Sequence, residues 1–189
     1  YVAQMRGWLP DYIGGVLWFG NDDANMVALT PIYSCLESVP DCYSAKHANA
    51  TTFSFRNAYW VCNWVSNMVY YRYDLLFPEL QAVRDRLEKD FNSVQDYMEA
   101  KAKEMGETEG KKFLSDYSLR MSGMMLDEWM QLAQKLIVKY NDMCVKKVDE
   151  KGDYILTPGG EPVGPQRPGY PEHYLRKMVE ESGDKYLIK

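Results

Sequence analysis

The spacing of hydrophobic and polar residues changes near residue 57. Before that point, short apolar runs alternate with clusters of Gly, Pro, Asn and Asp. Residues 15–21, GVLWFGN, place an apolar run between glycines, which predicts a short buried strand. Asn21, Asp22 and Asp23 then favour a turn. Residues 51–56, TTFSFR, alternate polar and aromatic side chains and predict another strand, with Phe53 and Phe55 on one face.

From Asn57 onward the apolar residues recur at helical spacing. Those that share one predicted helix face are Trp60, Trp64, Met68, Tyr71 and Leu75. Much of the remaining circumference is also apolar, so this helix is expected to be buried on most sides. Pro78 is expected to begin the next helix, because proline suits a first helical turn.

The rest of the chain is predicted to be helical until a Pro/Gly-rich tail. Charged residues dominate positions 79–103, which predicts a surface helix with a solvated face and i,i+4 ion pairs. A further long helix is predicted from about Thr108 to Val148. Residues 157–171, TPGGEPVGPQRPGYP, cannot form a helix or a central strand. A short helix is predicted after them, from Glu172 to Glu181.

These elements predict an α+β fold that is predominantly helical, with a few short strands followed by long helices. We expect residues 1–56 to form strands and loops that complete a sheet and a pocket, and residues 57–150 to form helices packed on them. Residues 151–189 are expected to form the tail and its short helix. The strands are too few to make a sheet with covered edges. The three segments are therefore expected to make one incomplete domain, whose other strands lie upstream.

Charge and composition exclude some partners. The formal net charge is −5 and the pI is about 5.1, so the chain lacks the basic face that nucleic acid or an anionic membrane surface requires. No run approaches the ~20 consecutive apolar residues of a membrane span. The sequence begins at Tyr1 and has no signal-peptide pattern. We therefore expect a processed product or a fragment with any targeting signal upstream, which leaves a cytoplasmic or an exported location open.

The cysteines and histidines offer no sequence pattern for a metal site. The cysteines are Cys35, Cys42, Cys62 and Cys144, without a CxxC pair or zinc-type spacing. Neither His47 nor His173 has a neighbour at metal-binding spacing. No metal site of this kind is therefore expected. Cys35 and Cys42 flank a Pro-containing loop, and whether they pair stays open.

The opening residues carry a family resemblance. The residues concerned are Arg6, Leu9, Pro10, Gly14, Gly15, Trp18, Gly20, Asp22, Asp23, Pro31 and Tyr33 in the stretch RGWLPDYIGGVLWFGNDDANMVALTPIY, followed by Pro40, Phe53, Phe55, Ala58, Tyr59, Trp60 and Asn67. In this combination the chain resembles the C-terminal portion of the PepD-type cysteine dipeptidases, which are bacterial peptidases of the N-terminal-nucleophile hydrolase superfamily. The likeness covers about the first 80 residues and then fades into generic helix.

The resemblance implies an αββα sandwich in which self-processing leaves a cysteine at the mature N-terminus. The thiolate of that cysteine attacks the scissile carbonyl, and its own α-amine is the general base. This chain begins with tyrosine, and none of its cysteines is terminal. If the resemblance holds, the chain contains no catalytic residue, and its partner is the N-terminal portion of the same precursor, which carries the nucleophile. No metal or organic cofactor is implied.

The resemblance also directs attention to residues that would contact a dipeptide. Arg6 suits the substrate carboxylate, with a structural salt bridge as the alternative. Asn21 is a candidate oxyanion donor, and Asp22 and Asp23 are candidates to hold an ammonium group, with a simple turn as the alternative. Trp18 is expected to line an apolar wall of the pocket, with plain core as the alternative.

Two other functions are compatible with the sequence. The chain could be a non-catalytic helical interaction module with an aromatic docking surface. It could also belong to an amidase or acylase of the same superfamily, since the nucleophile chemistry is shared and the fold alone does not separate these enzymes. The sequence leaves the preferred dipeptide and homo-oligomerisation open.

Overall fold

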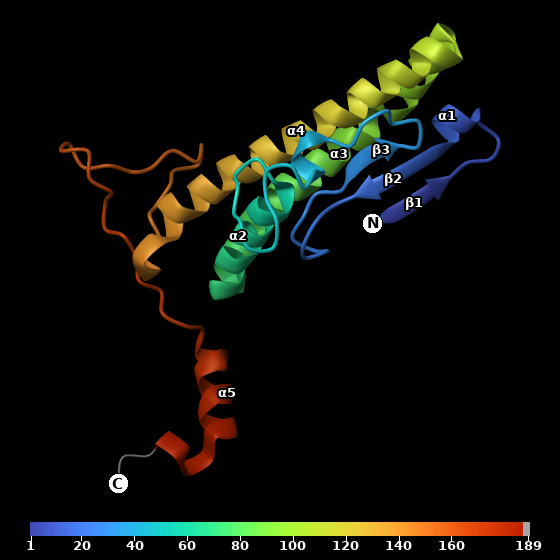
Figure 1. Ribbon diagram of the computed structural model, residues 1–189. Coiled ribbons are helices and arrows are strands. Elements are labelled where there is room, and N and C mark those ends of the chain that lie inside the picture. Colours follow the sequence, from blue (N-terminus) through green and yellow to red (C-terminus); the bar gives the residue numbers. More distant parts are fainter. Residues whose placement is uncertain (187–189) are drawn as a thin grey trace. The chain divides into compact units, whose positions relative to one another are not determined.

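The computed structural model describes residues 1–186 of the chain. The chain divides into two compact units, Tyr1–Gln134 and Lys135–Lys189. The division falls inside the last long helix, whereas the sequence predicts the tail from residue 151. The described residues are predominantly helical and include a small antiparallel sheet of three strands, as the α+β prediction required. Figure 1 shows the sheet beside the long helices of the first unit.

The sheet has the order β1-β2-β3, with β1 spanning Val2–Met5, β2 Gly15–Phe19 and β3 Thr30–Tyr33. A single short helix, α1 (Asp11–Gly14), lies between β1 and β2. The register pairs Gln4 with Val16 and Val16 with Tyr33, so these three side chains share one face. Val16 and Tyr33 are buried, which makes this the inner face. The predicted strand over the GVLWFGN run is confirmed as β2.

The opposite, outer face of the sheet is apolar and open. Leu17 is opposite Ala3 on one side and Ile32 on the other, and Met5 follows two residues after Ala3 on the same face. Met5 is 78% exposed and Leu17 is 36% exposed. Within residues 1–186, β1 pairs only with β2, so its other edge is unpaired. An apolar face beside an open edge is the feature that the incomplete-domain hypothesis predicts.

The strand predicted over residues 51–56 does not form. The backbone makes turns, with an isolated bridge between Asn49 and Thr52. The alternation still places Phe53 and Phe55 together, with ring centroids 4.8 Å apart in an edge-on contact. The ring of Phe55 contacts Trp64 on helix α2 (Ala58–Tyr71). The two phenylalanines therefore pack against a helix rather than against a neighbouring strand. A short 3₁₀ helix, η1 (Asp41–Tyr43), precedes this loop.

Helix α2 spans Ala58–Tyr71, and α3 spans Tyr73–Met105. The predicted helix start is confirmed: Asn57 is the N-cap, and its side chain accepts a hydrogen bond from the Trp60 backbone N–H. The start predicted at Pro78 is wrong. Arg72, at φ −147° and ψ 71°, separates the two helices, and Pro78 lies inside α3. Pro78 lies beyond the first turn of α3, so its missing N–H removes one helical hydrogen bond and its ring crowds the carbonyl group of Asp74; contacts elsewhere along this long helix offset that cost.

Helix α4 spans Glu107–Tyr140 and forms a hairpin with α3 (Figure 1). Gly106 ends α3 at φ 78°, a conformation that glycine adopts without strain. Gly110 allows close approach at the hairpin, because a Cβ there would lie 2.5 Å from the carbonyl oxygen of Ala102. The core of the first unit includes Leu87 and Phe91 from α3, and Leu114, Met125 and Trp129 from α4.

The second unit begins with the end of α4 and continues through a 3₁₀ turn, η2 (Asn141–Met143). The helix predicted to reach Val148 ends at Tyr140, because Asp142 and Met143 take left-handed backbone angles that stop it. Residues 145–166 form a loop in which isolated β-bridges pair positions of the loop with one another. Helix α5 (Glu172–Ser182) follows, close to the predicted helix, and then a 3₁₀ turn, η3 (Gly183–Tyr186). Between residues 141 and 185, no residue is buried. No helix among the described residues is both long and apolar enough to cross a membrane.

We predict that Gly110→Ala lowers the free energy of unfolding by about 1–3 kcal/mol, because the new methyl group would overlap the α3 backbone. Gly123→Ala on the same helix is the matched control, since a Cβ there meets nothing within 4 Å. The control should be neutral or stabilising by up to about 1 kcal/mol, from helix propensity alone. Urea unfolding measures both. Equal effects of the two substitutions would contradict the close approach.

Candidate functional site

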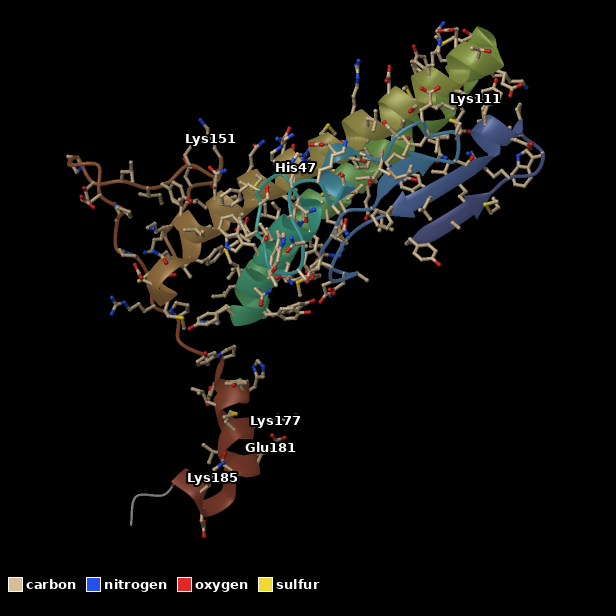
Figure 2. All side chains as sticks on the ribbon, viewed as in Figure 1. His47, Lys111, Lys151, Lys177, Glu181 and Lys185 are labelled. Atoms are coloured by element: carbon tan, nitrogen blue, oxygen red, sulfur yellow. The ribbon has the colours of Figure 1, made fainter. Side chains whose placement is uncertain are left out.

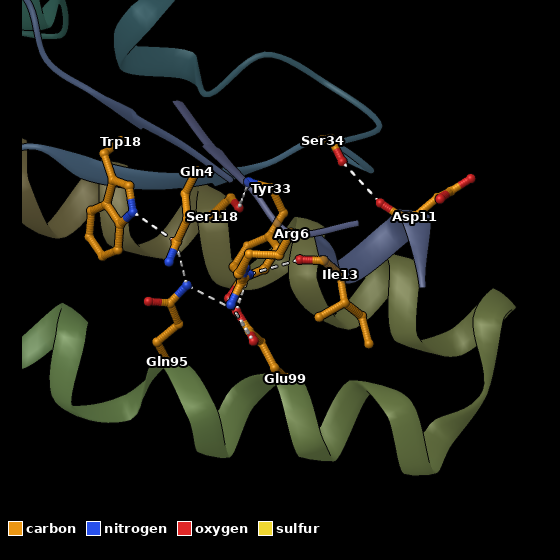
Figure 3. A network of polar contacts seen from close by, with 10 residues as sticks. All are labelled: Gln4, Arg6, Asp11, Ile13, Trp18, Tyr33, Ser34, Gln95, Glu99 and Ser118. Atoms are coloured by element: carbon orange, nitrogen blue, oxygen red, sulfur yellow. Dashed lines mark hydrogen bonds and ion pairs between the residues drawn. The ribbon is translucent and has the colours of Figure 1, made fainter. Parts of the chain in front are cut away.

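A buried polar network connects the inner face of the sheet to helix α3 (Figure 3). The strand period of two places Gln4 and Arg6 on the same side of the chain. The helical i,i+4 spacing places Gln95 and Glu99 on the same side of α3, facing the sheet. Two polar pairs from elements far apart in sequence therefore meet between sheet and helix.

Arg6 and Glu99 form the centre of this network. The two terminal guanidinium nitrogens of Arg6 donate to the two carboxylate oxygens of Glu99, at 2.8 and 2.6 Å. One of these nitrogens also donates to the carbonyl oxygen of Ile13 at 3.0 Å. The side chains of Arg6 and Glu99 are only 11% and 10% exposed, respectively. Tyr33 Oη and Gln95 Nε2 donate to the same carboxylate at 2.8 and 3.0 Å, so four donors neutralise one buried charge.

Trp18 belongs to the same network. Its indole N–H donates to Gln4 Oε1 at 3.3 Å, and Gln95 donates to that same oxygen at 2.9 Å. Trp18 is 8% exposed, so its ring lies in the core between sheet and helices. The structure thus brings Arg6 and Trp18 together, as the sequence hypothesis required, but as members of an internal network.

The hydrogen bonds of the network stabilise the protonated forms of Arg6 and Tyr33. The hydrogen bond from Arg6 to Glu99 raises the pKa of Arg6 above its ordinary value. Burial, followed by the hydrogen bond to Glu99, raises the pKa of Tyr33, which therefore remains a neutral donor. Since Glu99 already occupies both terminal nitrogens of Arg6, a substrate carboxylate would have to compete with Glu99 for them. The role of Arg6 in substrate binding stays a prediction.

The turn after β2 forms a second cluster, packed on helix α2. Asp22 adopts φ 72°, which is uncommon for a residue with a side chain. Its carboxylate accepts hydrogen bonds from Ser66 Oγ and from Asn63 Nδ2, the latter at 3.0 Å. Asp22 is nevertheless exposed, so lone pairs of a fixed anion face solvent. The Asp22 carboxylate is therefore fixed by two hydrogen bonds and accessible to solvent, on a residue with a strained backbone, and such a carboxylate suits the binding of a cation.

The neighbours of Asp22 complete this turn cluster. Asp23 accepts from the hydroxyl group of Tyr70 on α2 and from the backbone N–H of Asn25, the latter at 3.4 Å. The side-chain oxygen of Asn21 is buried and has no hydrogen-bond partner within residues 1–186. Buried polar groups are rarely left unpaired, so Asn21 has an unused hydrogen-bonding group beside two carboxylates.

Residues 1–86 match the model of peptidase family C69. Over these residues, which are less than half of the chain, the sequence is similar to the C69 peptidases. No curated protein matches the chain. The similarity of this segment favours a peptidase function. The C69 match contains the whole sheet, the Asn21–Asp23 turn and α2, and it ends inside α3, before Gln95 and Glu99 are reached.

The partners of Arg6, Trp18 and Asp22 are not predicted by the sequence. The charged residues at positions 79–103 predict a solvated helix face, which is wrong for Gln95 and Glu99, because both are buried. A signal was present: both lie on the α3 stripe that buries Leu87, Phe91 and Ala102 at helical spacing. Ser66, the partner of Asp22, carries no comparable signal, because it is an isolated small polar residue on the buried side of a mostly apolar helix.

All cysteines of the chain are free thiols. Cys35 and Cys42, whose pairing the sequence left open, therefore do not form a disulfide. Burial raises the pKa of Cys35, raises that of Cys42 to about 11, and raises that of Cys62. A raised thiol pKa opposes formation of a nucleophilic thiolate. Among residues 1–186, no group of three or more His, Cys, Asp and Glu side chains is placed to hold a metal ion.

We predict that Glu99→Gln lowers the free energy of unfolding by about 3–5 kcal/mol, because it leaves the Arg6 charge buried without its counter-ion. The control is Glu109→Gln, which removes the exposed partner of Lys112 on α4 and should cost less than about 1 kcal/mol. Urea unfolding curves of both variants measure the difference. A loss below about 1 kcal/mol for Glu99→Gln would show that Arg6 tolerates an unpaired state.

Proposed function

We propose that this chain is the C-terminal part of a cysteine dipeptidase, whose nucleophile lies on polypeptide outside these 189 residues. The observation that carries this proposal is the match of residues 1–86 to peptidase family C69. The reaction would be hydrolysis of the single peptide bond of a dipeptide. A thiolate would attack the carbonyl carbon, the amine of the second residue would leave, and water would release the acyl group.

The open sheet supports the location of the nucleophile. The outer face carries Met5 and Leu17 in exposed positions, and the free edge of β1 has unpaired backbone groups. In an αββα sandwich, a second sheet packs on such a face and buries its side chains. Polypeptide that supplies the second sheet would also bring an N-terminal cysteine to the sheet.

The thiols of this chain support the same location. Cys42 donates to the carbonyl oxygen of Ser122 and Cys62 is buried in α2, so neither is accessible for attack on a peptide bond. Their raised pKa values disfavour the thiolate at neutral pH. These two thiols are therefore poor candidates for the nucleophile of a cysteine peptidase, which supports a nucleophile on another segment.

The turn cluster is the proposed binding site for the substrate's free amine. Asp22 and Asp23 follow β2 directly, are held by α2, and provide negative charge at the end of the sheet. The side-chain NH2 of Asn21 is proposed to donate to the polarised carbonyl, and its unpaired side-chain oxygen is available to accept a hydrogen bond from a substrate N–H.

Arg6 lies at the other end of β2 from the turn cluster, where its backbone N–H donates to the carbonyl oxygen of Gly14. Its guanidinium group is paired with Glu99. Arg6 and Trp18 are therefore proposed to position the sheet rather than to contact the same dipeptide.

We predict that Asp22→Asn lowers kcat/KM for dipeptides by about 10–100-fold in the protein that includes the upstream polypeptide, mainly through a raised KM. The physical reason is the loss of charge opposite the substrate ammonium. The control is Asp90→Asn on the exposed side of α3, which should leave the kinetics unchanged. The measurement is steady-state hydrolysis of dipeptides, with N-acylated amides in parallel. Faster turnover of the acylated amides would favour the amidase or acylase alternative.

We predict that Cys42 and Cys62 resist alkylation by iodoacetamide at pH 8 in the folded chain and react in concentrated urea. With a pKa of about 11, only about one Cys42 thiol in a thousand is ionised at pH 8. Mass spectrometry of the labelled peptides locates the modified thiols. Native labelling of either residue at the rate of free cysteine would undermine the placement of the nucleophile outside this chain.

A further inference from the structure

A cavity of about 300 Å³ lies between the 41–56 loop and helix α4. Figure 2 labels His47, which belongs to this loop. The apolar wall of the cavity consists of Phe55 from the loop, and Leu119, Leu126 and Met130 from the helix. These residues are not part of the buried network or the turn cluster described above. The cavity is therefore a separate feature of the first unit.

Both walls of the cavity are held in place. Phe55 packs on Phe53 and on Trp64, with ring centroids 4.8 and 5.7 Å away. Cys42, which also lines the cavity, donates to the backbone carbonyl of Ser122 on α4. The helix side contains Gly123, where a Cβ would meet no atom within 4 Å. The space is therefore present without movement of either wall.

The rim of the cavity carries charges of both signs. Arg56 donates to Asp41 at 3.0 Å through one nitrogen, which leaves most of its N–H groups available. Asp41 also contacts His47 at 2.9 Å, and these two contacts lower the pKa of Asp41. Asp127, on α4, is exposed and has no hydrogen bond or ion pair to any described residue. One cation with free donors and one free carboxylate thus border an apolar space.

We propose that this cavity binds a free α-amino acid with an apolar side chain. Asp127 would accept the ammonium group, Arg56 would donate to the carboxylate, and the side chain would lie against Leu119, Leu126 and Met130. The volume is at the lower end of the range for small-molecule pockets, which fits a ligand of this size and excludes a long peptide. The site is distinct from the proposed hydrolytic site, and its binding needs no nucleophile.

Isothermal titration calorimetry of the full 189-residue chain with L-leucine tests the proposal. The two matched probes are 3-methylbutylamine, which lacks the carboxylate, and 4-methylpentanoate, which lacks the ammonium group. We expect saturable binding of one leucine per chain and at least about tenfold weaker binding of each single-charge probe, since each loses one charge-assisted contact.

Four variants locate the binding. Gly123→Leu places a side chain in the cavity and should abolish leucine binding, whereas Gly123→Ala should keep it. Asp127→Asn should weaken leucine binding at least about tenfold but should not weaken binding of 4-methylpentanoate, which has no ammonium group for Asp127 to accept from. Asp116→Asn, an exposed position on the same helix, should leave both unchanged. Thermal unfolding confirms that each variant is folded, and Asp127→Asn decides the question if Gly123→Leu does not fold.

Three results would overturn the proposal: no saturable binding below about 10 mM leucine, equal binding by the Gly123→Leu variant in folded form, or equal affinity for leucine and both single-charge probes.

Dipeptide hydrolysis by the protein with its upstream polypeptide is measured separately. Loss of leucine binding in Gly123→Leu with unchanged hydrolysis would separate this site from the hydrolytic one. Absence of hydrolysis would contradict the proposed function and leave the leucine result standing.

Discussion

The ion pair between Arg6 and Glu99 determines how the sheet packs on the helical hairpin. The two residues are 93 positions apart in sequence, and each is almost fully removed from water. Two charges in such a place are stable only when their geometry and hydrogen bonds offset the lost hydration. Tyr33 and Gln95 supply these additional hydrogen bonds, one from the last strand and one from α3. A single carboxylate therefore connects β1, β3 and α3 and fixes their relative positions.

Local chemistry made part of the fold predictable. The apolar run between glycines forms β2, and Asn57 caps α2, because the information for each lies within a few residues. Where the outcome depended on distant contacts, the prediction was wrong. Phe53 and Phe55 alternate like strand residues, but their rings pack on α2 and on each other. Pro78 is compatible with a helix start, but the break at Arg72 places it inside α3.

The candidate site divides in the same way. Residue type and position along the chain drew attention to Arg6, Trp18 and the Asn21–Asp23 turn, and each has a defined place in one of two clusters. Their partners could not be named from sequence, because Glu99 and Ser66 meet them only through the tertiary fold. The polar pair on the buried stripe of α3 was the one visible sign of an internal network. The unpaired edge of the sheet, in contrast, was anticipated from the small number of strands.

The position of Glu99 on α3 has a consequence for the length of that helix. The C69 match ends at residue 86, and the carboxylate that pairs with Arg6 follows thirteen residues later on the same uninterrupted helix. A helix turns by about 100° for each residue, so one inserted or deleted residue between these points would rotate Glu99 away from Arg6. The rotational phase of this segment is therefore fixed. An inserted or deleted whole turn would restore the rotation but move Glu99 by about 5.4 Å along the helix axis, so only changes of length beyond Glu99 leave the pairing intact.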